Sequence, residues 1–181
     1  MQNRHPRPEW LLHAAPTHCP YRTWLIDRGS LTRRIQSLCA NFNLRGLRTW
    51  RGKADRDEAA CVNLEFHIIA LLREVHLYCG DTPVVFAHSI IPKKGMNGPW
   101  HHLGKLGNKP LGAALFANPL VRRMPLQFRK LDRRHALYRR ACAILSEPPL
   151  HLWARRSVFI LQKYPILVTE VFLPGILELH P

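Results

Sequence analysis

The chain has little negative charge: 12 acidic residues stand against 27 lysines and arginines, for a formal net charge of +15. No apolar run approaches the roughly 18 residues that span a bilayer. The basic segment 1–16 has no apolar stretch long enough for a signal peptide. We therefore expect a cytoplasmic protein without stable membrane insertion. Its 181 residues are typical of a single domain over 1–181, which buries roughly 70% of its unfolded surface.

The chain has few cysteines, and their number and spacing do not suggest disulfide pairs. There are five, an odd number, and none forms a Cys-X-X-Cys pair. Disulfide frameworks belong to small, cysteine-dense secreted chains, so this pattern predicts free thiols in a reducing cytosol. The five are Cys19, Cys39, Cys61, Cys79 and Cys142.

The sequence also lacks the usual metal and nucleotide motifs. The pairs His18-Cys19 and His101-His102 have no second pair at zinc-site spacing, so we expect no metal. The eleven histidines are scattered, and none lies in a nucleophile motif. The glycine-rich stretch 104–112 does not have P-loop spacing. It is expected to be a loop that covers or lines a site.

Positive charge is concentrated in residues 122–140, where eight basic residues accompany one aspartate. Such charge favours a nucleic acid or an anionic membrane as partner. However, the chain has no zinc-finger spacing, basic heptad array or RNP-like aromatic motif. We therefore expect no nucleic-acid partner, and a basic field that attracts a small anion. Segment 121–150 is interpreted as a basic helical insert, and segment 1–20 as a mobile arm.

Two long hairpins dominate the expected secondary structure. Ser30 is a good N-cap, and Pro110 is typical of the first turn of a helix. Antiparallel hairpins with helices between them indicate an α+β fold with a single antiparallel sheet. The expected helices cover 31–39 and 111–116; the expected strands cover 43–50, 64–79, 84–91, 153–162 and 166–173.

Glu170 is an acid inside an apolar run, 166–173. Both faces of this strand are apolar, so the carboxylate is expected to be buried and to need a cation, hydrogen bonds or a proton. Arg73 lies on the apolar side of strand 64–79. Two interpretations remain open: an Arg73–Glu170 ion pair in the core, or a pocket in which Arg73 binds an anionic ligand and Glu170 meets a polar group of it.

Three other residues are weaker candidates. Arg155 and Arg156 are consecutive in a strand and must point to opposite faces, so one of them can face inward. The alternative is that one of the two arginines is solvated, while the other runs its side chain along apolar surface to reach water at the end of the strand. His88 shares a strand side with apolar residues, which is typical of a core histidine but also compatible with a pocket.

Six segments together resemble the chorismate pyruvate-lyase family. Their order and spacing match the family from about residue 20 to residue 174, although each is weak alone. They are Trp24-Leu25, Gly29-Ser30-Leu31-Thr32-Arg33-Arg34, Leu72-Arg73-Glu74, Leu106-Gly107-Asn108-Lys109-Pro110-Leu111-Gly112, Trp153-Ala154-Arg155-Arg156-Ser157 and Thr169-Glu170-Val171-Phe172-Leu173-Pro174.

The resemblance implies an antiparallel sheet with helical and loop flaps over a buried pocket, in a monomeric, cofactor-free enzyme. The implied reaction converts chorismate to 4-hydroxybenzoate and pyruvate, the first committed step of ubiquinone synthesis. Its product can be handed transiently to a membrane prenyltransferase. By the same resemblance, Arg73 holds the ring carboxylate, Glu170 meets the 4-hydroxyl, and Leu31 and Leu111 supply backbone or packing contacts.

This sequence departs from the family pattern at His88, where the family has arginine. Arg155 and Arg156 are the candidate replacements for holding the enolpyruvyl carboxylate. The main rival function is a non-catalytic small-molecule sensor of the same fold, like the effector domains of winged-helix repressors. Only about 40 residues precede the first expected strand, which we expect to be too few for a DNA-binding domain. A basic nucleic-acid-binding protein is the second rival.

Overall fold

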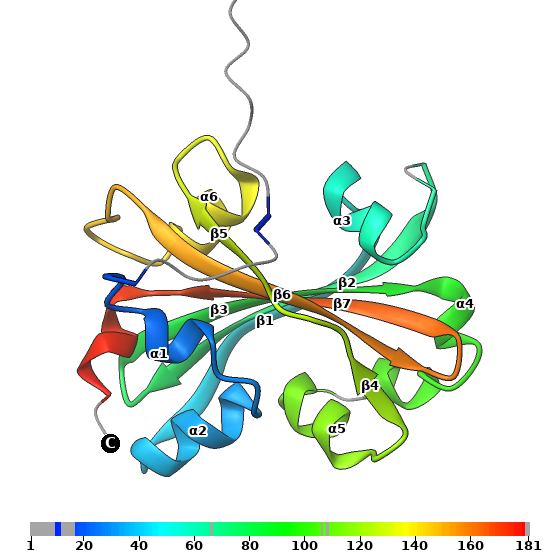
Figure 1. Cartoon of the computed structure of the whole chain (residues 1–181), viewed down its shortest axis with the longest axis horizontal. Helices are drawn as coiled ribbons and strands as arrows, with labels where there is room; N and C mark the ends of the chain where they lie inside the picture. The colour runs from blue at the N-terminus through cyan, green and yellow to red at the C-terminus, as the bar shows by residue number, and fades with distance from the viewer. Residues whose placement is uncertain (1–9, 12–16, 66, 106, 108, 180–181) are drawn as a thin grey trace, which may run out of the picture.

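A computed structural model describes residues 10–11, 17–65, 67–105, 107 and 109–179. A single antiparallel sheet of seven strands runs through it, with helices on both faces (Figure 1), which confirms the α+β prediction. The sheet order is β1-β2-β3-β7-β6-β4, and β5 also pairs with β6. The strands are β1 (Phe42–Lys53), β2 (Ile69–Cys79), β3 (Thr82–Pro92), β4 (Val121–Arg123), β5 (Gln127–Leu131), β6 (Leu152–Leu161) and β7 (Tyr164–Phe172).

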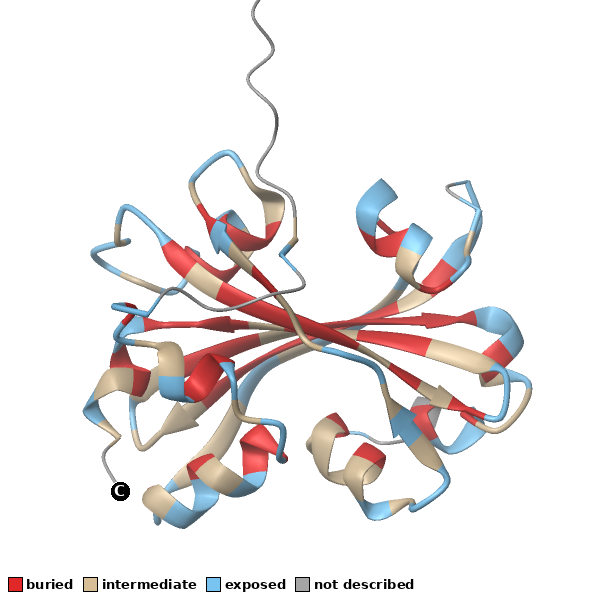
Figure 2. Ribbon diagram, in the orientation of Figure 1, coloured by how far each residue is buried: buried red, intermediate tan, exposed pale blue. Residues whose placement is uncertain are grey.

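The helices form a layer on each side of the sheet. They are α1 (Arg22–Leu25), α2 (Leu31–Leu38), α3 (Arg56–Cys61), α4 (Lys93–Met96), α5 (Leu111–Ala117) and α6 (Ala136–Cys142), with 3₁₀ turns η1 (His101–Lys105) and η2 (Pro174–Glu178). Figure 1 shows α1, α2 and α5 below the sheet and α3 and α6 above it. Buried residues follow the central strands and the helix sides next to them (Figure 2). This two-sided burial explains why both faces of the central strands are apolar.

Both predicted hairpins are confirmed. β2 and β3 meet at a turn where Gly80 has φ +58°, a left-handed conformation that glycine adopts without steric cost. β6 and β7 form the second hairpin, and β7 also pairs with β3. The predicted cap of α2 is present as well, since Ser30 Oγ accepts a hydrogen bond from Arg33 N at 3.4 Å.

The prediction of a basic helical insert across 121–150 is wrong in its secondary structure. This segment contains two strands, β4 and β5, and only then the short helix α6. Pro119 and Pro125 interrupt any continuous helix here. β4 and β5 both pair with β6 and together complete one edge of the sheet. The helix was inferred from the number of basic residues, and that number does not distinguish a strand from a helix.

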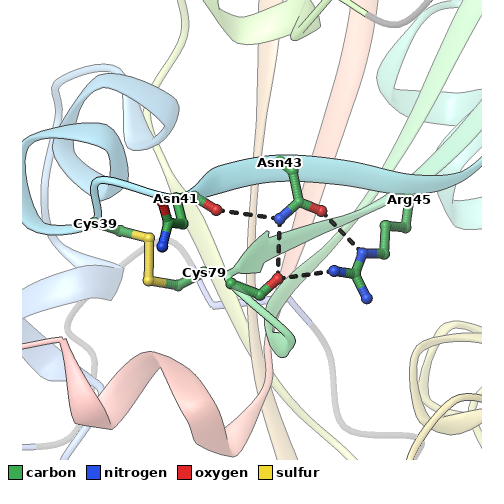
Figure 3. The surroundings of a disulfide bond; sticks show 6 residues. Cys39, Asn41, Asn43, Arg45 and Cys79 are labelled. Carbon is green, nitrogen blue, oxygen red and sulfur yellow. Dashed lines mark hydrogen bonds between the residues drawn. A yellow bond between two sulfur atoms is a disulfide. The ribbon is translucent and has the colours of Figure 1, made fainter.

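The prediction of five free thiols is also wrong. Cys39, the C-cap of α2, is bonded to Cys79 at the end of β2, with Cα atoms 5.8 Å apart (Figure 3). The two residues are 40 positions apart in the sequence, but Phe42 pairs with Cys79 in the β1–β2 ladder and brings them together. Beside the disulfide, Asn43 Nδ2 donates to the Asn41 and Gly80 carbonyls at 3.1 and 2.9 Å. The bond ties the end of α2 to the sheet.

The predicted mobile arm falls largely outside the described residues, which omit 1–9 and 12–16. Within it, Trp10 Nε1 donates to Asp57 Oδ2 at 2.9 Å, and Leu11 forms a bridge with Phe128. Among the described residues, no helix is long and apolar enough to cross a membrane.

Candidate active site

A partly enclosed cavity lies between the sheet and the helices α2 and α5. Its apolar wall includes Val75 and Phe159, and its polar lining includes Arg73, Arg123 and Glu170. Its volume of about 40 Å³ is room for about three water molecules, at ~10–15 Å³ for each water centre. The two covering helices touch: a Cβ added at Gly112 of α5 would lie 3.5 Å from Thr32 Oγ1 of α2.

Arg73 places a buried cation in this cavity. The residue is 5% exposed, and its Nη2 donates to the Lys109 carbonyl at 2.9 Å and more weakly to that of Gly107 at 3.4 Å. Its guanidinium makes no ion pair with any carboxylate in the described ranges. Burial lowers the pKa of Arg73, because the charged form has lost its water. A buried guanidinium without an acidic partner is an anion-binding group.

Glu170 is held by Arg155, not by Arg73. Arg155 Nε donates to Glu170 Oε2 at 2.5 Å. The Arg155 side chain is fully buried, and its Nη1 donates to the carbonyls of Trp24 and Asp27 at 2.7 and 2.6 Å. Glu170 itself is only partly buried, with 18% of its side chain exposed, and it lines the cavity. The core-pair interpretation of Arg73 and Glu170 is therefore wrong, and the pocket interpretation remains.

The sheet register sets the separation of Arg73 and Glu170. Arg73 pairs with Ser89, and Ser89 with Val168, which is two residues before Glu170. Two strand spacings and a two-residue offset place the Cα atoms roughly 12 Å apart, at ~4.8 Å per strand and ~3.4 Å per residue. The side chains share one face of the sheet, so a guanidinium and a carboxylate lie at two ends of the cavity, at a separation that suits the two ends of a six-membered ring.

Leu31 and Leu111 line the same cavity on the side opposite the sheet. Each is the first residue of its helix, α2 or α5, each is buried, and each lines the cavity. The first N–H groups of a helix have no acceptor within the helix. The loop before α5 also contributes, since Gly107 and Lys109 accept from Arg73 and Pro110 lines the cavity. The glycine-rich stretch therefore lines a site, as predicted; Leu106 and Asn108 lie outside the described residues.

Residues 17–179 match the family model for chorismate lyase. The chain belongs to the chorismate lyase family. Among its relatives, a protein of Nitrosomonas europaea named "Probable chorismate pyruvate-lyase" is 51% identical over 92% of this chain and 95% of its own length. A protein of the same name from Aromatoleum aromaticum is 49% identical over 87% of this chain and 86% of its own.

Solved structures share the fold at low identity. The effector domain of PhnF from Mycobacterium smegmatis has a TM-score of 0.57 at 15% identity, over 83% of this chain and 91% of that domain. A GntR-family transcriptional regulator from Bacillus cereus has a TM-score of 0.53 at 10% identity, over 75% of this chain and 93% of its own. The chorismate lyase fold is thus shared with ligand-binding domains of regulators.

Two candidates from the chorismate lyase resemblance lie on the other face of the sheet. Arg156 Nε donates to Gln127 Oε1 at 2.7 Å and Nη1 to Asp57 Oδ2 at 3.1 Å, and its guanidinium lies 4.2 Å from the Trp10 ring centroid. His88 is 1% exposed, between Ala87 and Ser89, which line the cavity from the opposite face. The structure thus corrects the pocket-lining interpretations of both residues, because strand alternation turns them away.

His88 instead belongs to a buried ionic network. Its Nδ1 lies 3.2 Å from Glu74 Oε1 and its Nε2 lies 3.5 Å from Glu58 Oε1, while Arg140 Nη1 lies 3.0 Å from Glu74 Oε1. Burial alone disfavours the imidazolium, but the two neighbouring glutamates outweigh it and raise the pKa of His88. Burial likewise disfavours ionised Glu74, yet His88 and Arg140 lower the pKa of that carboxyl.

The cavity contains one cation that sequence reasoning missed. Arg123 of β4 lines it, although the sequence placed this residue in a basic helix. The flanking prolines were the available signal, but a three-residue strand is too short for an alternation to be recognised. Within the described ranges, no cluster of His, Cys, Asp or Glu has the arrangement of a metal site.

Proposed function

We propose that this chain is a chorismate pyruvate-lyase that uses the cavity between Arg73 and Glu170. The observation that carries this proposal is a buried guanidinium with no acidic partner among the described residues, in the same partly enclosed cavity as a carboxylate, in a member of this family. Its substrate, chorismate, is a dianion with a six-membered diene ring, a hydroxyl group and an enolpyruvyl ether. The two ends of the cavity match the ring carboxylate and the hydroxyl.

Arg73 binds the ring carboxylate in this proposal. Its planar fork can donate two parallel hydrogen bonds to a carboxylate, while the Lys109 carbonyl fixes the other side of the guanidinium. Leu31 and Leu111 cover the ring and present their backbone N–H groups to it. The net positive charge of the chain attracts the dianion toward the cavity.

Glu170 meets the 4-hydroxyl group. Because Arg155 holds one carboxylate oxygen at 2.5 Å, the carboxylate is fixed in position with its other oxygen available. Arg155 is thereby a positioning residue, tied in turn to the carbonyls of Trp24 and Asp27. Arg155 therefore links the end of α1 to the Glu170 carboxylate.

The reaction needs no oxidant, because the ring becomes aromatic as the C3–O bond breaks and C4 loses its hydrogen. The enolpyruvyl methylene gains one hydrogen and becomes the methyl group of pyruvate. In one route the C4 hydrogen passes directly to the methylene; in the other, an acid protonates the methylene and the C4 proton is lost separately. In both routes the protein's main task is to hold the reactive conformer. Chorismate deuterated at C4 separates them: direct transfer puts deuterium in the pyruvate methyl, and the other route releases it to water.

The tight cavity has a kinetic consequence. A six-membered ring needs more room than three waters, so α2 and α5 must separate for the substrate to enter and the product to leave. We infer that release of 4-hydroxybenzoate limits turnover. A rapid burst of 4-hydroxybenzoate before the steady state supports this inference, and linear product formation from the first turnover contradicts it.

Location and assembly also belong to this proposal. The family resemblance favours a monomer that works in the cytoplasm and hands its product to a membrane prenyltransferase. Light scattering on the purified protein should give a mass close to the 21.0 kDa of one chain. A stable dimer contradicts the monomer.

The direct test is incubation of the purified protein with chorismate. Ultraviolet absorbance follows 4-hydroxybenzoate, and lactate dehydrogenase with NADH measures pyruvate. Equal amounts of the two products support the proposal. Binding of 4-hydroxybenzoate without any turnover of chorismate instead indicates a sensor on this fold. Salt-dependent binding to random DNA, unchanged by 4-hydroxybenzoate, indicates a nucleic-acid-binding protein.

A further inference from the structure

Arg123 presents a second guanidinium to the cavity. Its Nη1 donates to the Arg28 carbonyl at 2.9 Å and more weakly to that of Gly29 at 3.4 Å. Its guanidinium carbon lies 5.4 Å from the ring centroid of Phe116 and 5.2 Å from that of Phe159. The side chain is thus held between two aromatic rings and the loop that leads into α2.

One donor of Arg123 has nothing to bind. Its Nε is buried and donates to no acceptor in the described part of the chain. The guanidinium also makes no ion pair with a described carboxylate: Glu170 is held by Arg155 and Asp27 by Arg34. Burial lowers the pKa of Arg123 to about 10, so the group is still charged at neutral pH. A buried, charged donor of this kind is costly unless a ligand satisfies it.

The charges around the cavity favour a dianion. Three guanidiniums, on Arg73, Arg123 and Arg155, face one carboxylate, on Glu170, which leaves two positive charges. Chorismate carries two carboxylates, whereas 4-hydroxybenzoate carries one. Arg155 Nη2 also has no partner among the described residues, but the charge of Arg155 is matched by Glu170, so Arg73 and Arg123 are the two cavity cations without a described carboxylate partner.

Arg73 and Arg123 line the cavity from strands near opposite edges of the sheet. Arg73 lies on β2 and Arg123 on the edge strand β4, four positions along the sheet. Their Cα atoms are therefore roughly 19 Å apart, at ~4.8 Å per strand. Two extended arginine side chains and one substrate fill this span.

We propose that Arg123 binds the enolpyruvyl carboxylate of chorismate and so distinguishes the substrate from the aromatic product. This inference rests on the proposed function. It assigns to β4 the role for which Arg155 and Arg156 were the candidates from the sequence. Arg123 also holds the Arg28 and Gly29 carbonyls, so the proposed carboxylate site lies next to the loop before Leu31. Once pyruvate leaves, the product keeps only the contacts of Arg73 and Glu170.

The test compares Arg123→Gln with Arg122→Gln. Arg122 is the adjacent residue of β4, is exposed and points away, so it is a control for the loss of one charge. In Arg123→Gln, kcat/KM for chorismate is expected to fall by roughly 30-fold or more, as when one side of a buried charge pair is truncated. The Kd of 4-hydroxybenzoate, measured by calorimetry, is expected to stay within about threefold. Arg123→Lys should recover part of the loss.

A second test changes the substrate instead of the protein. It uses wild type and does not require that a variant folds. Methylating the enolpyruvyl carboxylate of chorismate removes the charge that Arg123 is proposed to bind. The ester should bind wild type roughly 30-fold more weakly than chorismate. In Arg123→Gln, the ester and chorismate should bind alike.

The outcomes separate the two proposals. If wild type neither converts chorismate nor binds 4-hydroxybenzoate, the proposed function fails. If wild type is active but Arg123→Gln keeps its kcat/KM, or loses affinity equally for substrate and product, the assignment of Arg123 fails alone. Unchanged binding of the methyl ester to wild type overturns it as well.

Discussion

Truncating Arg73 is the sharpest perturbation of the proposed site. Arg73→Ala removes a guanidinium that is 5% exposed and has no acidic partner among the described residues. The ring carboxylate of chorismate then enters a cavity with nothing to neutralise it at that end. Arg73→Lys keeps the charge but loses the planar fork and the geometry of the 2.9 Å contact with the Lys109 carbonyl.

The size of the effect follows from the burial of Arg73. Truncating one partner of a buried, hydrogen-bonded charge pair costs about 2–5 kcal/mol. Each ~1.4 kcal/mol is tenfold, so kcat/KM for Arg73→Ala should fall by about 30- to 4,000-fold. The lysine variant loses one hydrogen bond to a charged group, worth about 1.5–3 kcal/mol. Its kcat/KM should fall by about 10- to 100-fold.

The assay follows 4-hydroxybenzoate formation by absorbance over a range of chorismate concentrations. Circular dichroism and thermal unfolding show whether each variant is folded. Arg51→Ala is the matched control, since Arg51 is exposed on the neighbouring strand β1 and its loss changes the net charge equally. A kcat/KM of Arg73→Ala within about threefold of wild type refutes the role given to Arg73.

Three further predictions concern other parts of the structure. Glu170→Gln keeps an acceptor for its arginine partner, so the fold should persist while kcat falls roughly 10²-fold; unchanged kcat removes Glu170 from the mechanism. Denatured protein should show three thiols without reductant and five after reduction, and five thiols before reduction exclude the disulfide. Loss of the Cys39–Cys79 bond should lower the free energy of unfolding by up to about 4 kcal/mol. Because the pKa of His88 is raised above 6.5, the free energy of unfolding should decline as pH rises from about 6.5 through that raised value, and then level off. His88→Gln should lose this decline and keep its KM; a changed KM contradicts its place on the far face.

Alternation was the most informative signal in the sequence. It predicted both hairpins, and it placed Arg73 and Glu170 on buried strand faces that line one cavity. This works because the side chains of a strand alternate strictly between two faces. The same rule predicted that Arg155 and Arg156 lie on opposite faces of the sheet, which the structure confirms.

Partners across the sheet could not be predicted. Glu170 pairs with Arg155 because β6 and β7 are adjacent in register, whereas Arg73 lies two strands away. Cys39 and Cys79 meet for a similar reason, through the β1–β2 ladder. Strand order and register are long-range properties, and composition or cysteine count carries little information about them.

The basic segment shows a second limit. Residues 121–123 and 127–131 form short edge strands whose conformation depends on pairing with β6. Their own periodicity is too brief to favour strand over helix. Arg123 was consequently counted as part of a charged helix face, although it lines the cavity.

The structure of the protein bound to 4-hydroxybenzoate tests the central claim most directly. The account predicts the ring between α2 and the sheet, with its carboxylate within hydrogen-bonding distance of Arg73 and its hydroxyl at Glu170. A product molecule bound elsewhere, or one whose carboxylate does not touch Arg73, contradicts it.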